Sequence, residues 1–448
     1  MARAAGGAHG WTCPAVPVHR LPMRDHTLQR DSLKRHARRL FEAGVKAVEP
    51  GRAVAQALEA WSPPAPGAGG RLVVVALGKA AGAMTRAALE TVQPSVALAV
   101  TNHGNADPVA GAEIRMAGHP VPDADGLRAA QAVQDVAQAL TARDRLLVLW
   151  SGGGSALLPA PVAGVSLQDK ITVSRSLLAC GADITEMNLV RQQLSRLKGG
   201  GLLRAAAPAE VHALILSDVI GDDLRVVASG PTAAPLGTRA DARAVLRRHG
   251  LWPDLPEAVR AHLQQSQDPA LPGEMPRAQN RLIGSNAMAL QAMARHDPAA
   301  HAASQPLCGD VADAAQVVLD RVSGHRGTWL FGGETTVRLR GDGRGGRNQE
   351  LALRVALLAR ARGIAGPWVF LSGGTDGRDG PTDAAGAVVD DDTISRIAAA
   401  GIDPEAALAR NDSYTALAAA GDLLMTGPTG TNVADLQVFC LGTGTRPG

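Results

Sequence analysis

The chain has 448 residues, which favours two domains, because ordinary soluble domains contain about 100–200 residues. Hydrophobic residues make up 46% of it, but only four Phe, six Trp and one Tyr are present, so the cores must be aliphatic. The 45 basic and 42 acidic residues give a net charge of +3. Such a balanced chain with so few aromatic rings lacks both the basic face and the stacking platforms of a nucleic-acid binder, and we exclude nucleic acid as a partner.

The chain also lacks the signals of a membrane or secreted protein. Its apolar runs are far shorter than the roughly 18 residues that a membrane span needs. Residues 1–25 contain no apolar core of a secretory signal and are predicted to be a disordered leader. The four cysteines are scattered and have no metal-ligand spacing. Together these features favour the reducing cytoplasm.

Apolar residues recur at helical spacing from His26 to about Leu58, and a Pro-rich segment from Trp61 to Gly67 ends this pattern. Short aliphatic strands, Gly-rich turns and Ala-rich helices then alternate along the chain. This alternation predicts mainly parallel sheets that are covered by helices on both faces. The predicted strands are Arg71–Leu77, Leu146–Trp150, His212–Leu216, Thr328–Phe331, Thr335–Leu339 and Trp368–Leu371.

The segment Gly250–Arg281 contains five prolines and is predicted to be an exposed linker or an irregular edge. We place the domain boundary there, with an N-terminal domain at residues 26–265 and a C-terminal domain at 280–448. Ligands of open α/β sheets bind beyond the carboxyl ends of the strands. We therefore expect the functional site in a cleft between the two domains.

Five strand ends share one pattern, in which an aliphatic run is followed by glycine and a polar or charged residue. Glycine lets the backbone approach a ligand closely and point successive N–H groups at an anion. One such turn alone is explained by tight packing between a strand and a helix, but five that carry acids and a lysine favour an anion site with carboxylates for a metal. The five turns are Gly78–Gly82, Ser151–Ser155, Ser217–Asp223, Gly332–Thr335 and Ser372–Gly380.

Lys79 is the strongest single candidate, because it stands where a strand meets a helix and could join the positive end of that helix at one anion. The chain has only five lysines, so a retained lysine in a site motif is informative. The alternative is an ordinary solvated lysine. Lys198 lies in a second Gly-rich segment, and a glycine helix cap explains that segment about as well.

Six aspartates lie in two of the turns. Loop carboxylates suit Mg²⁺, which takes one or two of them and leaves its other positions to water and phosphate. At least half of the six are expected to be turn or helix-capping residues instead. The six are Asp218, Asp222, Asp223, Asp376, Asp379 and Asp383.

Two generic nucleotide motifs can be weighed directly. No Gly-x-x-x-x-Gly-Lys-Ser/Thr is present, because Ala80 follows Gly78-Lys79, and this excludes a P-loop hydrolase. A Gly-x-Gly-x-x-Gly occurs at Gly341, Gly343 and Gly346. The strand after it ends in Ser372 instead of the acid that holds a ribose, so dinucleotide binding is disfavoured.

Taken together, the motifs resemble the glycerate 2-kinase family, also called the MOFRL family, from about Leu40 to Val438. The resemblance is carried by Leu40–Val48, Gly78–Ala81, Ser151–Ala156, Ser217–Asp223, Ala228–Thr232, Gly332–Val337, Gly345–Glu350, Gly373–Gly386 and Thr426–Val433. It implies a Rossmann-like N-terminal domain, a smaller C-terminal MOFRL-type α/β domain and an active site in the cleft between them. It further implies phosphorylation of D-glycerate at the 2-hydroxyl by ATP with Mg²⁺, which yields 2-phosphoglycerate and ADP.

Within this resemblance, the hypothesis assigns catalysis to Lys79, Arg347, Asp218 and Asp376. Lys79 and Arg347 face phosphate or carboxylate, and either aspartate takes the proton of the hydroxyl. Alanine at Lys79 or Arg347 is expected to leave folding normal and to abolish activity. The metal candidates are Asp222, Glu334 and Asp379. The substrate or nucleotide contacts are assigned to Gly78, Ser151, Gly152, Gly153, Gly154, Ser155, Lys198, Gly373, Gly374 and Asn432.

Two rival functions stay open. Some members of the family are labelled hydroxypyruvate reductases, so an NAD(P)H-dependent reductase is the first alternative. The second is a noncatalytic regulator that binds sugar phosphates or other anions. Neither explains the acidic loops as well as a kinase does. The sequence fixes neither the range of hydroxyacids nor the oligomeric state, and a homodimer stays an option.

Overall fold

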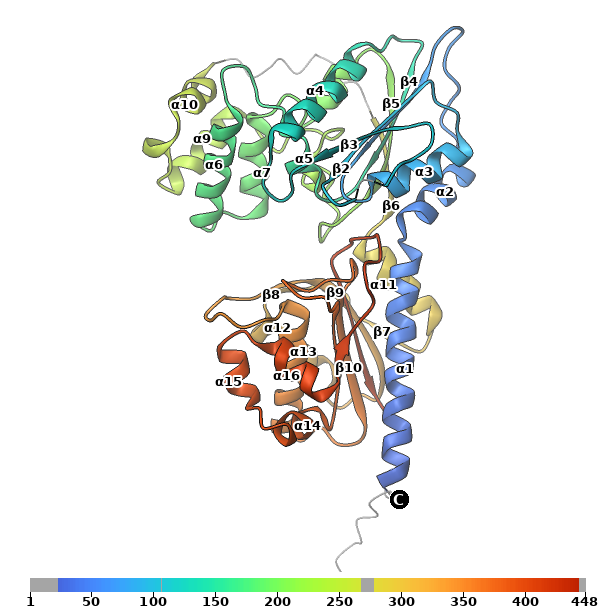
Figure 1. The fold of residues 1–448 in the computed structure, drawn as a ribbon, viewed down its shortest axis with the longest axis vertical. Helices are drawn as coiled ribbons and strands as arrows, with labels where there is room; N and C mark the ends of the chain where they lie inside the picture. The colour runs from blue at the N-terminus through green and yellow to red at the C-terminus, as the bar shows by residue number, and fades with distance from the viewer. Residues whose placement is uncertain (1–22, 106, 267–277, 443–448) are drawn as a thin grey trace, which may run out of the picture.

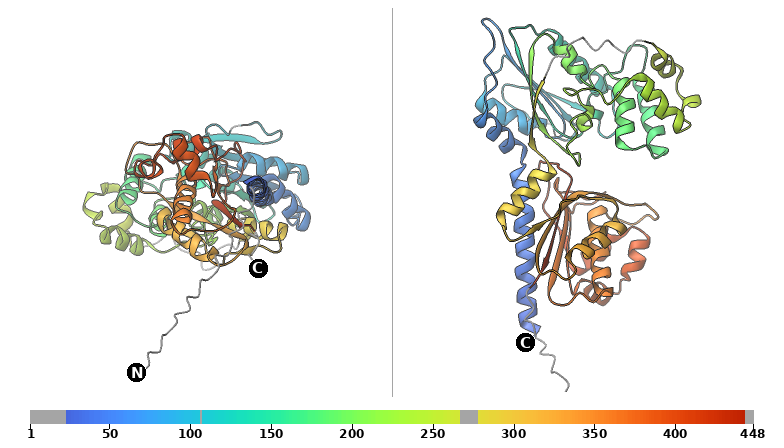
Figure 2. Two further views of the ribbon diagram at one scale, coloured as in Figure 1. Left: turned by 90° about the horizontal axis from the view of Figure 1, so that it is seen from below. Right: turned by 180° about the vertical axis from the view of Figure 1, so that it is seen from behind.

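The computed structural model describes residues 23–105, 107–266 and 278–442, and it forms two lobes stacked along the long axis of the molecule (Figure 1). Each lobe is built around its own sheet with helices on both sides (Figures 1 and 2). The predicted two-domain α/β architecture is therefore confirmed. The predicted leader lies outside the described residues up to residue 22, and Met23 begins the first helix.

The first sheet has the strand order β3-β2-β1-β4-β5-β6, and all of its strands are parallel. This is the order of a Rossmann-type doubly wound sheet, as expected for the N-terminal domain. Its strands are β1 (Leu72–Leu77), β2 (Val96–Asn102), β3 (Glu113–Ala117), β4 (Arg145–Trp150), β5 (Glu210–Leu216) and β6 (Ala278–Gly284).

Helices cover both faces of this sheet because alternate aliphatic side chains of each strand point to opposite sides. Val74 and Leu147 pack toward α2 (Pro50–Ala60) and α3 (Ala81–Thr91), whereas Val75 and Val148 pack toward the opposite face. That second face is covered by α4 (Ala124–Gln138) and α8 (Gly201–Ala206).

A helical lobe with its own small core projects from the first domain (Figure 1). Leu177, Val190 and Leu246 are among its buried residues. Its helices are α6 (Leu167–Ala179), α7 (Ile184–Gln193), α9 (Arg239–Arg248) and α10 (Glu257–Gln264).

The second sheet has the order β12-β11-β10-β13-β9-β7, and β8 pairs with β9. Its central pairs are antiparallel, and only β7 and β8 run parallel to β9, so the prediction of mainly parallel sheets is wrong for this domain. The strands are β7 (His301–Ala302), β8 (Leu307–Asp310), β9 (Gly327–Thr336), β10 (Trp368–Gly374), β11 (Gly386–Asp390), β12 (Leu423–Leu424) and β13 (Asp435–Leu441). The two strands predicted at Thr328–Phe331 and Thr335–Leu339 are thus one strand that ends at Thr336.

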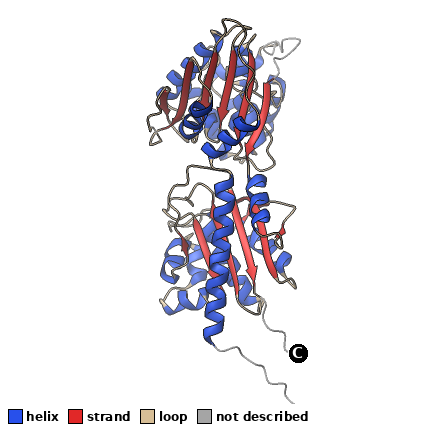
Figure 3. Ribbon diagram, turned by 90° about the vertical axis from the view of Figure 1, so that its right-hand side faces the viewer, coloured by secondary structure: helices blue, strands red, loops and turns tan. Residues whose placement is uncertain are grey.

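Two layers of helices sandwich the second sheet. The long helix α1 (Met23–Ala47) lies across one face with α11 (Asn286–His296), as Figure 3 shows. The opposite face carries α12 (Val311–Val322), α13 (Arg347–Ala361), α14 (Thr393–Ala399), α15 (Pro404–Ala409) and α16 (Ser413–Ala420). No helix among the described residues is long and apolar enough to cross a membrane.

The domain limits in the structure differ from the predicted limits of residues 26–265 and 280–448. Helix α1 packs on the second sheet and not in the N-terminal domain, and Lys34 fixes it there through ion pairs to Asp390 (2.6 Å) and Asp422 (3.1 Å). Strand β6 pairs with β5, so residues 280–284 belong to the first sheet. The predicted irregular segment Gly250–Arg281 contains α10 and the start of β6, and residues 267–277 lie outside the described residues.

Candidate active site

The direction in which successive strands are added to the first sheet reverses between β1 and β4. At such a point the loops that follow the two strands diverge and leave a crevice at the carboxyl ends of the strands. Two of the predicted turns, Gly78–Gly82 and Ser151–Ser155, follow these two strands directly. The backbone N–H of Lys79 donates to the Gly152 carbonyl (3.0 Å), and that of Ala80 donates to the Ser151 hydroxyl (3.1 Å). The two turns are thus joined at the point where a doubly wound fold binds its ligand.

Glycine is required at two positions of this junction. Gly78 has φ +115°, and an added Cβ would collide with the side chain and the carbonyl of Ser151. A Cβ on Gly152 would collide with the carboxylate of Asp218, which enters from the turn after β5. The backbone of the Ser151–Ser155 turn therefore lies directly against an acid from the neighbouring strand end.

Lys79 lines the crevice. Within the described part of the chain, its ammonium has no ion-pair or hydrogen-bond partner. Its side chain crosses Gly153 beside His119, since a Cβ on Gly153 would lie 3.1 Å from Lys79 Cγ and 3.3 Å from His119 Cδ2. Burial and the Lys79 charge lower the pKa of His119 to about 4, so its imidazole is neutral at pH 7. This leaves Lys79 as an uncommitted cation, the state that an anion contact requires.

A cavity of about 640 Å³ extends from this crevice to the second domain. Lys79, Ser151 and Gly152 line it from the first domain, and Asp376 and Asn432 line it from the second. The expected cleft between the domains is therefore present, and it brings five sequence-predicted site residues together. The cavity is further lined by Arg86, Asn102, His103, Asn105, Asp107, His119, Arg378, Pro428 and Thr431.

Carboxylates from both domains approach one another in this region. The pKa of Glu334 is raised, first by burial and then by the negative charges of Asp435, Asp218 and Asp376, whereas Arg347 opposes the rise. Burial also raises the pKa of Asp218, and the positive charge of Lys79 opposes it. The charges of Asp218 from the first domain and Asp376 from the second both act on Glu334, and we refer to these three residues as the acidic group.

Arg347 is held in a different way from the prediction. Its guanidinium binds both oxygens of Asp435, with distances of 2.6 and 2.9 Å, and lies 3.0 Å from Glu334. Asp435 is completely buried, so this pair fixes the start of α13 to β13. The Arg347 guanidinium, which was predicted to bind a phosphate, is thus already paired with two carboxylates.

Three predicted ligands have structural partners instead. Asp379 accepts hydrogen bonds from the backbone N–H groups of Asn348 (3.1 Å) and Gln349 (2.8 Å), so it caps α13 and is poorly placed as a metal ligand. Gly373 and Gly374 lie within β10, where the Gly374 N–H bonds to Ala385, and they are not a free phosphate-binding turn. The two glycines allow close packing, since a Cβ on Gly373 would meet Phe41 of α1 at 2.9 Å.

The other predicted contacts near the first sheet divide into two groups. The backbone N–H groups of Gly152, Gly153 and Gly154 have no acceptor within the described residues, as an anion-binding turn requires. Lys198 is 3% exposed and donates to the carbonyls of Ser155 (2.7 Å) and Leu158 (2.8 Å). Its hydrogen bonds therefore hold the Ser151–Ser155 turn in place, and Lys198 does not line the interdomain cavity.

Asp222, the remaining predicted metal ligand, has a φ of +56°, and its Oδ1 is buried without a hydrogen-bond partner in the described structure. It follows Asp218 in the same turn but does not line the interdomain cavity. The structure therefore brings Glu334, but neither Asp222 nor Asp379, into the acidic group.

The Gly-x-Gly-x-x-Gly match has a packing explanation. A Cβ on Gly341 or Gly343 would collide with the Arg410 backbone, and one on Gly346 would collide with Asp379. These glycines let residues 341–346 lie against the connection between α15 and α16. The motif therefore does not form a dinucleotide-binding turn at the end of a parallel strand.

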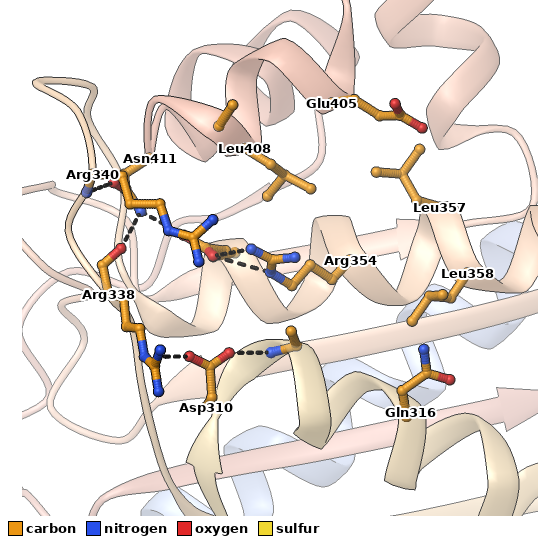
Figure 4. Close-up of a pocket in the computed structure, with 13 residues that line it drawn as sticks. Asp310, Gln316, Arg338, Arg340, Arg354, Leu357, Leu358, Glu405, Leu408 and Asn411 are labelled. Atoms are coloured by element: carbon orange, nitrogen blue, oxygen red, sulfur yellow. Dashed lines mark hydrogen bonds and ion pairs between the residues drawn. The ribbon is translucent and has the colours of Figure 1, made fainter.

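A second cavity of about 460 Å³ lies on the helical face of the second domain (Figure 4). Its charges are largely paired with one another. Arg354 binds Glu350 at 2.8 Å, and Arg338 lies 3.6 Å from Asp310. Because most of its charges are paired and it receives no residue of the first domain, this cavity is a weaker candidate for catalysis.

Sequence reasoning missed several residues of the site, among them His119, Arg378 and Asp435. His119 and Arg378 line the cavity, and Asp435 anchors Arg347. Arg378 lies two residues after Asp376 in a quoted motif, so its position was a usable signal. His119 and Asp435 follow no glycine-rich turn, and only the fold brings them to the cleft.

The fold and the cleft define a two-domain α/β protein with a free cation and an acidic group at a topological switch point. Residues 36–264 match the family "Domain of unknown function (DUF4147)", and residues 327–435 match the MOFRL family. The chain is 39% identical to human glycerate kinase, covering 95% of this chain and 97% of that protein. It is also 39% identical to D-glycerate 2-kinase of Thermotoga maritima, covering 91% and 98%.

The structural comparison agrees with these relatives. The crystal structure of Thermotoga maritima glycerate kinase has a TM-score of 0.83 at 37% identity, and the match covers 92% of this chain and all of that one. A Pyrococcus horikoshii protein gives 0.76 at 34% identity, covering 95% and 100%. An Agrobacterium vitis protein that is named as a hydroxypyruvate reductase is 43% identical, covering 92% and 95%. The chain belongs to the glycerate kinase family, with a DUF4147 domain followed by a MOFRL domain.

Proposed function

We propose that the protein phosphorylates D-glycerate at its 2-hydroxyl with ATP and Mg²⁺ and releases 2-phosphoglycerate and ADP. The observation that carries the proposal is the cavity between the domains, which is lined by Lys79 of the first domain and by Asp376 of the second. The glycerate kinase names of relatives that cover nearly the whole chain support the same substrate class. Phosphoryl transfer needs positioning and charge neutralisation more than covalent chemistry, and this cavity offers both.

Lys79 and Asp218 are proposed to act together on the acceptor. The free ammonium of Lys79 neutralises charge on the transferring phosphoryl group or on the glycerate carboxylate. Asp218 accepts the proton of the 2-hydroxyl, because burial raises the pKa of its carboxyl toward the range of a general base. Asp376, on the opposite wall, is the alternative acceptor for this proton. The free N–H groups of Gly152–Gly154 hold phosphate oxygens.

A divalent cation is proposed to bind at the acidic group, although the three carboxylates do not lie close enough together in this structure to surround one ion. The negative charges of Asp218 and Asp376 raise the pKa of Glu334, and a cation would relieve this repulsion. Their oxygen ligands suit Mg²⁺. When bound, the ion supplies neutralisation of phosphate charge; Glu334 and either aspartate would hold it.

The reductase alternative has weaker support from this chain. Its one sequence signal was the glycine motif at Gly341–Gly346, and those glycines pack against Arg410 and Asp379. NADH oxidation with hydroxypyruvate and no ATP requirement would favour the reductase over the kinase.

The decisive experiment combines the protein with ATP, Mg²⁺ and D-glycerate and identifies the product by phosphorus NMR. The resonance of 2-phosphoglycerate is expected, and 3-phosphoglycerate or unchanged ATP would contradict the proposal. Lys79→Ala is expected to lower kcat by about 10³ or more, since it removes a charge that faces the phosphoryl group. Lys46→Ala is the matched control, because Lys46 is exposed on α1 and does not line the cavity.

We place this reaction in the cytoplasm, which is supported by cysteines that form no disulfide among the described residues.

A further inference from the structure

The second domain contributes to the interdomain cavity a cation that the proposed chemistry has not used. Arg378 lines this cavity from the loop that follows β10, two residues after Asp376. We propose that Arg378 binds the carboxylate of the substrate, and that Arg378 and Asp376 together select acids with a hydroxyl on the carbon next to the carboxylate. This assignment rests on the proposed function, and it leaves Lys79 to the phosphoryl group.

The first observation concerns the side chains of the cavity lining that can carry a positive charge, which are Lys79, Arg86, His103, His119 and Arg378. His119 is neutral at pH 7, because its pKa falls to about 4. His103 lies 2.8 Å from a carboxylate oxygen, and Arg86 donates to a backbone carbonyl at 3.5 Å. Within the described residues, the charged groups of Lys79 and Arg378 have no hydrogen-bond or ion-pair partner. Each domain therefore supplies one free cation, and the reaction has two anions to hold, a phosphoryl group and a carboxylate.

The second observation is that the loop carrying Arg378 is held in a fixed shape. Asp376 Oδ1 accepts the backbone N–H of Arg378 at 3.0 Å, and the Asp376 carbonyl accepts the backbone N–H of Thr429 at 3.3 Å. Gly377, between the two charged residues, has φ +84°, and an added Cβ would collide with the Gly427 carbonyl. A turn that is fixed before the substrate arrives loses little conformational freedom on binding.

The third observation is the match between this turn and the substrate. In an acid with a 2-hydroxyl, the hydroxyl and the carboxylate are on adjacent carbons, so the groups that bind them must be neighbours as well. Asp376 and Arg378 are separated by one residue, and both line the cavity. A carboxylate accepts a hydrogen bond from a hydroxyl, and a guanidinium donates two parallel hydrogen bonds to a carboxylate. Glycerol lacks the carboxylate, and the 3-hydroxyl of glycerate is one carbon further away, so the pair favours the acid and its 2-hydroxyl.

Arg86 is the competing residue for the carboxylate. It lies on α3 of the first domain, seven residues and therefore about two helical turns after Lys79. No acidic residue lies within two positions of Arg86 in the chain, so its turn of helix does not offer a carboxylate and a guanidinium side by side. The two arginines are on different domains, and single variants of each separate the two assignments.

The test uses Arg378→Met in the full chain, which removes the charge and keeps much of the side-chain volume. Calorimetric titration with D-glycerate, in the presence of a non-hydrolysable ATP analogue and Mg²⁺, measures binding without turnover. The Kd for D-glycerate is expected to rise about tenfold or more, and the Kd for the analogue by about twofold at most. Arg378→Lys should lose less affinity, because an ammonium keeps the charge without the planar fork. Arg175→Met, at an exposed position of α6, is the control and should match the wild type.

Titration with glycerol adds a measurement that a merely structural role would not change. The wild type should bind D-glycerate more tightly than glycerol, and Arg378→Met should lose most of this preference. Thermal denaturation without ligand should give the same unfolding temperature for both proteins, because the Arg378 guanidinium has no partner to lose.

An unchanged Kd for D-glycerate in Arg378→Met, or a larger loss of affinity in Arg86→Met, would overturn the inference. If the wild type binds D-glycerate through Arg378 but forms no phosphoglycerate, the binding residue stands and the proposed kinase function fails. If the wild type forms 2-phosphoglycerate while Arg378→Met binds D-glycerate as the wild type does, the kinase function stands and the inference fails.

Discussion

At the scale of single residues, the environment of a charge decides whether it is free to act. Lys79 and Arg347 look alike in sequence, because each follows a glycine at the start of a helix. Lys79 is uncommitted in the cavity, whereas Arg347 is paired with the buried carboxylate of Asp435. The two cations should therefore respond differently to mutation.

Arg347→Ala is expected to destabilise the fold, contrary to the expectation from sequence. Removing the guanidinium leaves Asp435 as an uncompensated buried charge, at a cost of about 3 kcal/mol in the free energy of unfolding; the 34% exposure of Arg347 keeps this near the low end. Urea denaturation measures the change. The double variant Arg347→Ala/Asp435→Asn should recover most of the loss, and an Arg347→Ala protein as stable as the wild type would refute the argument.

Asp379 predicts a pH dependence of stability. Burial raises the pKa of its carboxyl to about 6, above the value of 3.8 for an unperturbed aspartate. The folded state then holds the proton more tightly, so this contribution is present below about pH 4 and is lost as the pH rises through 6. Relative to Asp379→Asn, the unfolding free energy of the wild type should decline by about 3 kcal/mol from pH 4 to 7. Denaturant titrations of both proteins at four pH values would show it, and parallel curves would contradict it.

At the scale of elements, the turn after β4 sets the distance between the backbone and Asp218. Gly152→Ala would place a methyl group in the position of that carboxylate, so the acid or the turn must shift. Because a displacement of about 1 Å can lower a rate by about 10²-fold, we expect a loss of this size in kcat. Steady-state kinetics and circular dichroism test this together. Gly51→Ala in α2 is the control, since Gly51 does not line the cavity and its added methyl would come no nearer than 3.3 Å to another residue, the side chain of Glu49. Equal activity of the two variants would exclude the proposed geometry.

Some strands can be identified from their local sequence pattern, and others cannot. The strand Leu72–Leu77 is continuously aliphatic because both of its faces are buried, and it was predicted almost to the residue. Strand β13 contains the buried Gln437, and β6 starts with polar residues after a proline-rich segment. Neither has an aliphatic run with clear borders, and their pairing partners are far away in the chain. These strands could not be identified from local pattern.

At the scale of the whole molecule, the chain passes between the domains twice among the described residues. One crossing lies at Val48 and Glu49 between α1 and α2, and the other lies at Ser285 between β6 and α11. The crossings adjoin, because a Cβ on Gly284 would be 3.4 Å from Val48 Cβ. Adjacent crossings favour rotation of one domain about a single hinge.

Closure about this hinge would exclude water from the cavity and protect ATP from hydrolysis. The radius of gyration from small-angle X-ray scattering should therefore decrease when a non-hydrolysable ATP analogue, Mg²⁺ and D-glycerate are added together. The ATP analogue alone provides the control for binding to one domain. Identical scattering curves with and without the ligands would rule closure out.

The sequence by itself determined the α/β class, the two domains and the turn that carries Lys79. These properties depend on composition and on local patterns. A glycine at a strand end permits the same backbone conformations and the same close approach wherever the strand lies in the fold. Only the tertiary structure decided that α1 packs on the sheet of the second domain, that Asp379 caps a helix and that Arg347 is paired with Asp435. The physical reason is that burial and pairing depend on neighbours far apart in the chain, and these decide which of many similar charges remains free to bind a ligand.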